Sequence, residues 1–200
     1  MKLPGSSLGL FQAKTAAKAA PAANDPDAKA IAAIEKVGGS VRPLAQNDER
    51  KEVSFYLQGA AIKDADIAPV AQLKNVAWVH LGKTSVTDAG LAQLKGLSDL
   101  VQLHLEGTKI TDAGLAHLKG MSKLEYLNVY NTAVTDAGLE HLKSLSSLKS
   151  LYVWQTKVTP DGVKKLKAAL PKCEVVQGWD LEIKPPAKAP DEKKPEEKKN

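Results

Sequence analysis

The chain has 200 residues but contains a single cysteine, nine aromatic residues and no long apolar run. Cys173 therefore forms no internal disulfide and has no second thiol with which to bind zinc or form a redox pair. No segment approaches the roughly 20 apolar residues that a membrane helix needs, so we expect no membrane span. Nucleophile elbows, glycine-rich phosphate loops and paired metal motifs are also missing. These absences predict a protein that is not an enzyme and needs no cofactor.

A localised excess of positive charge is missing as well. The net charge is +5, but residues 52–180 hold 14 lysines and 13 carboxylates, so the excess lies in the flanks. Nucleic-acid binding usually needs a basic stripe on the folded domain. We therefore expect no nucleic-acid partner.

The sequence does contain a repeat with a period of 24 residues. Residues 86–91 read VTDAGL, residues 110–115 read ITDAGL, and residues 134–139 read VTDAGL again, with weaker copies from Ile62 and Val158. A fixed period of this length is typical of a solenoid, whose units bury their apolar faces by stacking on one another. Function is then expected to belong to a surface built from several repeats.

Each repeat predicts one short helix followed by one strand. In residues 86–109, Thr87 or Asp88 can cap a helix whose leucines recur at helical spacing. Leu103 and Leu105 then alternate with polar residues, which indicates a strand. The expected fold class is therefore α/β: a solenoid with one short parallel strand and one helix per repeat, curved into an open arc.

These residues resemble the leucine-rich-repeat family. The pattern Leu-x-x-Leu-x-Leu-x-x-Thr-x-Ile over residues 100–110 looks like the family's conserved segment, with threonine where asparagine or cysteine is frequent. The Thr-Asp-Ala-Gly-Leu opening is similar to bacterial repeats of this type and to those of F-box-type leucine-rich proteins. The resemblance covers about residues 52–178 and implies a binding surface rather than an activity.

Four segments are expected along the chain. Residues 1–24, rich in alanine, lysine and proline, and residues 184–200, rich in lysine, glutamate and proline, have too few large apolar side chains to fold and are predicted to be disordered. Residues 25–51 are predicted to form a capping helix, with Ile31, Ile34 and Val37 on its apolar face, and a connection. Residues 52–183 are predicted to form the repeat domain.

The polar positions of the predicted strands hold six of the nine aromatic residues. Aligned at a spacing of 24, they predict three columns on the exposed sheet face, with Ser54 beside Trp78, Tyr56 beside His80 and Gln58 beside Gly82. Aromatic and amide side chains on a rigid sheet are typical of protein-binding surfaces. The predicted partner-binding residues are Tyr56, Trp78, His80, His104, Glu106, Tyr126, Asn128, Tyr130, Tyr152 and Trp154.

Other interpretations of this face remain open. The rings can stack on neighbouring strands, about 4.8 Å apart, and only stabilise the sheet. Alternatively, the face can bind a carbohydrate or another small molecule, or serve as a self-associating spacer. His80 and His104 are too few ligands for a metal site, and none is predicted. The repeated Asp88, Asp112 and Asp136 are interpreted as helix caps.

The partner and the compartment cannot be named from these residues. Pro4 and Gly5 interrupt the apolar start of the chain, which makes a poor secretory signal. Residues 1–24 are therefore either a disordered tail or the remnant of an atypical or truncated export signal, and both a cytoplasmic and an extracytoplasmic location stay open. We expect a monomer that binds an unidentified protein or peptide.

Overall fold

The computed structural model describes residues 27–178. The two predicted tails, 1–24 and 184–200, lie outside these residues. The α-helices are α1 (Ala28–Lys36), α2 (Asp64–Ile67), α3 (Asp88–Gln93), α4 (Asp112–Ala116), α5 (Asp136–Leu142) and α6 (Pro160–Ala169). The strands are β1 (Ser40–Pro43), β2 (Lys51–Ser54), β3 (Val76–His80), β4 (Gln102–His104), β5 (Tyr126–Asn128), β6 (Ser150–Tyr152) and β7 (Glu174–Val176). Short 3₁₀ turns cover Gly59–Ala61, Ala68–Gln72 and His117–Gly120.

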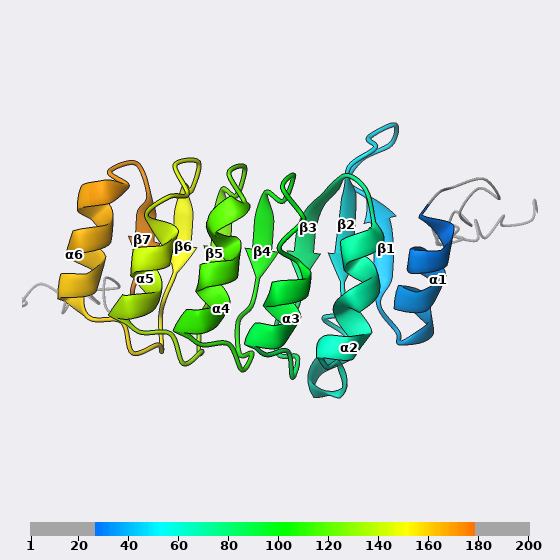
Figure 1. Cartoon of the computed structure of the whole chain (residues 1–200), viewed down its shortest axis with the longest axis horizontal. Coiled ribbons are helices and arrows are strands. Elements are labelled where there is room, and N and C mark those ends of the chain that lie inside the picture. Colours follow the sequence, from blue (N-terminus) through cyan, green and yellow to red (C-terminus); the bar gives the residue numbers. More distant parts are fainter. Residues whose placement is uncertain (1–26, 179–200) are drawn as a thin grey trace, which may run out of the picture.

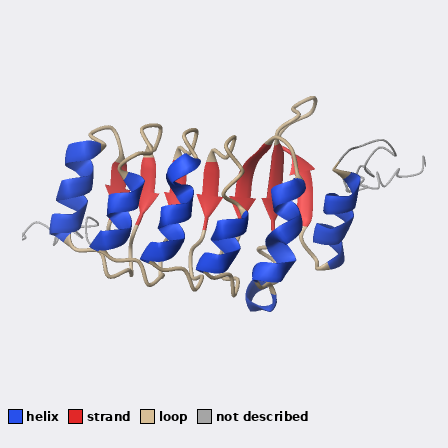
Figure 2. Cartoon of the chain, viewed as in Figure 1, coloured by secondary structure: helices blue, strands red, loops and turns tan. Residues whose placement is uncertain are grey.

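The strands form one sheet in chain order, β1 to β7. The pair β1–β2 is antiparallel and every later pair is parallel. The helices stand in a row against one face of this sheet (Figure 1), and loops along the two long edges of the row connect the strands and helices (Figure 2). The predicted α/β solenoid is confirmed, and the second sheet face carries no helix of the described residues.

The core lies between the helices and the sheet, where the periodic apolar residues meet. In the repeat that begins at Val86, the helical Leu91 and the strand residues Leu103 and Leu105 have no exposed surface. Each fully buried leucine stabilises the fold by roughly 1.5–3 kcal/mol relative to an exposed one. Because each repeat packs on its neighbours, this stabilisation is shared along the whole row.

A threonine closes the turn after each of the strands β3 to β6. The Thr108 hydroxyl donates to the Leu105 carbonyl at 2.6 Å, and Thr84, Thr132 and Thr156 make the same bond in their turns. The residue before each threonine has a positive φ, namely Lys83, Gly107, Asn131 and Gln155. These four hydroxyls therefore satisfy one carbonyl in each turn along the row.

Each helix from α3 to α6 is capped by its threonine. In α3 to α5 the aspartate after this threonine has a different role from the one expected. The Thr111 hydroxyl accepts from the Ala113 N–H at 3.3 Å, which makes threonine the cap. The carboxylate of Asp88 instead accepts from the backbone N–H of Thr111 at 2.8 Å and from its hydroxyl at 2.6 Å. The interpretation of the aspartates as caps of their own helices was therefore wrong.

We call this pair of hydrogen bonds the Asp–Thr bridge. It joins each repeat to the next one at four places, Asp64 to Thr87, Asp88 to Thr111, Asp112 to Thr135 and Asp136 to Thr159. Hydrogen bonds to a charged acceptor are stronger than neutral ones. The bridges therefore fix the distance between successive helices at their N-terminal ends.

The repeated glycine of each helix leaves room for this carboxylate. A Cβ on Gly138 would collide with Oδ1 of Asp112, and a Cβ on Gly90 or Gly114 would meet the preceding aspartate in the same way. The first repeat has Asp66 in place of this glycine, and within residues 27–178 no bridge reaches α2 from an earlier helix. There the carboxylate of Asp66 accepts from the Lys63 N–H at 2.8 Å instead.

The N-terminal end of the row contains a strand that the sequence does not predict. Ile31 and Ile34 of α1 are buried against the first repeat, and Val37 is partly buried. Residues 40–43 then turn back as β1 and pair with β2. Short polar strands of this kind carry little periodicity, so their pairing is decided by the neighbouring strand rather than by their own residues.

Candidate functional site

The sheet face opposite the helices carries the predicted binding residues, and the strand pairing sets them in columns. Parallel pairing places Trp78 beside Gln102, Tyr126 and Ser150, and places His80 beside His104, Asn128 and Tyr152. These positions are half-buried while the residues between them are fully buried. Two of the three columns expected for β3 to β6, those of Trp78 and His80, are therefore confirmed. We call this surface the open sheet face.

The predicted columns are wrong at β2. Ser54 pairs with His80 and Glu52 with Trp78, a spacing of 26 residues rather than 24. Six residues, 56–61, separate Phe55 from Ile62, whereas four separate Leu81 from Val86. Because of this longer turn, Tyr56 follows the strand in a loop and does not continue the His80 column. Glu52 takes a place on the open sheet face that sequence analysis did not assign to it.

Four rings form a continuous stack across the open sheet face. The ring centroids are 4.3 Å apart between His80 and His104, 4.7 Å between His104 and Tyr126, and 5.3 Å between Tyr126 and Tyr152. Aromatic pairs at such distances stabilise by about 0.5–1.5 kcal/mol beyond their buried area. Stabilisation of the sheet therefore explains the presence of these four rings without a ligand.

Two carboxylates flank the histidines of this stack. Glu52 Oε1 lies 3.2 Å from His80 Nε2, and Glu106 Oε2 lies 3.7 Å from His104 Nδ1; neither contact has hydrogen-bond geometry. Burial, followed by the nearby charge of His80, lowers the pKa of His104 from 6.5 to about 4. His104 is therefore neutral at physiological pH. Burial is also the main cause that raises the pKa of Tyr126.

Trp154 and Tyr130 form a second ring pair, with centroids 5.2 Å apart. The indole lies over Gly178, where any Cβ would collide with it. Trp154 nevertheless keeps 47% of its surface exposed. An indole that is fixed from below and open above has lost much of its rotational freedom before any partner arrives.

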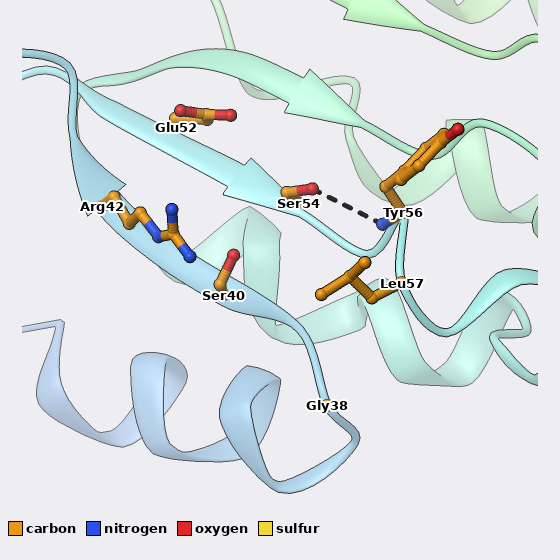
Figure 3. A pocket seen from close by; sticks show the side chains of 7 residues that line it. All are labelled: Gly38, Ser40, Arg42, Glu52, Ser54, Tyr56 and Leu57. Carbon is orange, nitrogen blue, oxygen red and sulfur yellow. Dashed lines mark hydrogen bonds between the residues drawn. The ribbon is translucent and has the colours of Figure 1, made fainter. Parts of the chain in front are cut away.

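A pocket of about 240 Å³ lies at the β1 end of the open sheet face (Figure 3). Arg42 and Ser40 reach it from β1, Glu52 and Ser54 from β2, and Tyr56 and Leu57 from the following loop. Tyr56 is 51% exposed, and the Lys83 ammonium lies 5.7 Å from its ring centroid. The repeat pattern predicts Tyr56 but neither Arg42 nor Leu57. Arg42 comes here by an antiparallel pairing and Leu57 by a longer turn, and neither feature recurs in the later repeats.

The parallel strand, the leucines and the threonine turn recur with the 24-residue period in the described residues. The fold is a leucine-rich-repeat solenoid. Three solved structures are similar to it. Internalin C2 of Listeria monocytogenes is 31% identical with a TM-score of 0.48, an internalin F of the same organism 22% with 0.47, and a leucine-rich-repeat protein of Leptospira interrogans 21% with 0.38.

The matched part is 55% of this chain in each case, and it corresponds to 45%, 30% and 32% of the three proteins respectively. The chain thus spans less than half the length of each. No protein-family model and no curated protein sequence matches the chain. The assignment of the fold therefore rests on the repeat geometry of the solenoid itself.

The described part of the solenoid brings together no group of three or more histidine, cysteine, aspartate or glutamate side chains that could hold a metal ion. Within residues 27–178, no helix is both long and apolar enough to cross a bilayer.

Proposed function

We propose that the protein is a non-catalytic recognition module that binds a protein or peptide on the open sheet face. The single observation that carries the proposal is the rigid, half-exposed Trp154 indole beside Tyr130. Tryptophan and tyrosine residues that are fixed before binding are the side chains that most often dominate binding energies.

The ten predicted residues divide into three groups under this proposal. His80, His104, Tyr126 and Tyr152 pack mainly on one another, so they support the surface. Trp154, Tyr130, Trp78 and Tyr56 are proposed as the anchors that the partner covers. Asn128 and Glu106 are proposed to orient it, although the Asn128 amide oxygen already accepts from the Tyr130 N–H at 3.0 Å.

Affinity capture with matched variants tests the proposal. One variant carries Trp154→Ala and Tyr130→Ala, and its control carries His117→Ala and His141→Ala on the helix side of the same row. A partner retained by the wild type and the control should be lost, or bound at least tenfold more weakly, by the first variant. Equal retention by all three proteins, with circular dichroism spectra that match, would refute the proposal.

The ring stack itself supports a second candidate, in which the face is structural or mediates self-association. Light scattering across a concentration series separates it from the first, because self-association through this face should be lost with Trp154→Ala. Carbohydrate binding on the same face stays a further prediction, tested by calorimetric titration with glycans.

The predicted similarity to bacterial and F-box-type repeats also stays a prediction.

A further inference from the structure

Arg42 is an exposed cation on β1 that forms no ion pair with another described residue. Its cross-strand neighbour is Glu52, but the Glu52 carboxylate lies 3.2 Å from His80 Nε2 instead. Among the described residues, no carboxylate lies within ion-pair distance of the Arg42 guanidinium. Arg50, in the same hairpin, contrasts with it because its guanidinium binds the Asp48 carboxylate at 2.8 Å.

The surroundings of Arg42 combine hydrogen-bonding groups with apolar surface. The Ser40 and Ser54 side chains lie beside the guanidinium in the pocket (Figure 3). The opposite wall is formed by Tyr56 and by Leu57, which is 88% exposed. The two-residue extension of the turn after β2, which the turns after β3 to β6 lack, builds this wall.

We propose that this pocket binds a carboxylate carried next to an apolar side chain. The guanidinium is always charged, and its fork of N–H donors matches the two oxygens of a carboxylate. Tyr56 and Leu57 would cover the neighbouring apolar group and lose exposed surface in doing so. A volume of about 240 Å³ is smaller than that of a typical small-molecule site and suits one residue at the end or side of a chain.

The position of the pocket connects it with the function proposed above, on which this inference rests. Ser40 and Arg42 stand directly opposite Ser54 and Glu52, so their side chains share the open sheet face. A peptide lying across that face toward β1 would reach Arg42 after passing Trp78 and Glu52, which share its row. The pocket would then fix the direction of the peptide.

Short probes test the pocket separately from the rest of the face. N-acetyl-leucine carries the free carboxylate, N-acetyl-leucinamide is its uncharged match, and N-acetyl-glutamyl-leucinamide carries the carboxylate on a side chain. Each is titrated to millimolar concentration into the ¹⁵N-labelled full chain while amide shifts of residues 40–57 are followed. Arg42→Gln is compared with Arg50→Gln, which removes an equal charge from the same hairpin.

The expected result is saturable shifts with one or both carboxylate probes, none with N-acetyl-leucinamide, and at least about tenfold weaker binding to Arg42→Gln than to Arg50→Gln. The tighter of the two carboxylate probes then shows whether a chain end or an acidic side chain is recognised. Equal shifts with acid and amide, equal effects of the two arginine variants, or no shifts at all would overturn the inference.

These probes are too short to reach Trp154 from Arg42, five strands away. A negative result with these probes would therefore overturn carboxylate binding at Arg42 and leave the capture experiment on Trp154 and Tyr130 unaffected. Conversely, loss of the proposed recognition function would show in that capture experiment while the response of Arg42 to N-acetyl-leucine is measured independently.

Discussion

Mutations of the Asp–Thr bridge and of the repeated glycine should have non-additive effects on the free energy of unfolding. Asp112→Ala removes two hydrogen bonds, to the N–H and the hydroxyl of Thr135, both at 2.7 Å. Hydrogen bonds to a charged group contribute about 1.5–3 kcal/mol each, and partial exposure of this site favours the low end. We expect Asp112→Ala to lower the free energy of unfolding by about 2–3 kcal/mol.

Gly138→Ala should disturb the same bridge, because it places a methyl group against the Asp112 carboxylate. Its new methyl group would collide with the Asp112 carboxylate and meet Leu115 Cδ1 at 3.0 Å and Val134 Cγ1 at 3.1 Å. Overpacking of this kind costs about 1–3 kcal/mol, against a gain of roughly 0.5–1 kcal/mol from replacing glycine by alanine in a helix. We therefore expect a net loss of about 1–2 kcal/mol.

The double variant tests the coupling between these two residues. Removing the Asp112 carboxylate clears most of the space that the alanine needs, so the two losses should fall short of additivity by at least about 1 kcal/mol. Urea unfolding followed by circular dichroism gives the three free energies. Gly120→Ala is the control, because a Cβ there would meet nothing within 4 Å. Additive losses, or equal effects of Gly138→Ala and Gly120→Ala, would refute the reasoning.

Two further predictions concern titratable groups. The pKa of His104 is lowered to about 4, so the unfolded chain takes up a proton at higher pH than the folded chain does. The free energy of unfolding should therefore fall by about 1–3 kcal/mol as the pH drops from 6.5 toward 4. Urea unfolding at pH 7 and pH 4.5 should show a smaller difference for His104→Gln than for His117→Gln, and equal differences would contradict this. Burial raises the pKa of Cys173 to about 11, so at pH 8 a thiol-reactive dye should label the native protein far more slowly than the urea-unfolded one; equal rates would contradict it.

The interior repeats could be predicted well because each feature recurs three times and its neighbours are copies of itself. The period shows directly that Leu103 and Leu105 are buried and that His104 lies on the opposite face. The role of Asp88 could not be predicted in this way, since its acceptor function depends on a residue 23 positions later. A short side chain beside a helix start suits a cap equally well when only one helix is considered.

The N-terminal part of the open sheet face was harder to predict. Its strand β2 pairs at a spacing of 26 with β3, so alignment at 24 moves Tyr56 into a column that it does not occupy. Arg42 belongs to a strand that pairs in the opposite direction and has no counterpart elsewhere in the repeats. The registers of the β1–β2 and β2–β3 pairs each occur only once in this sheet, so no repeated sequence pattern indicates them.

The bridges make neighbouring repeats interchangeable at their junctions. Every bridge spans 23 residues and offers the same carboxylate to the same threonine. Excision of residues 110–133 would therefore bring Asp88 against Thr135 in the geometry that Asp112 now occupies, and duplication of the same stretch would create one more identical junction. Array length can thus change by whole units during gene duplication or in the laboratory, while the terminal surfaces around β1 and Trp154 move closer together or further apart.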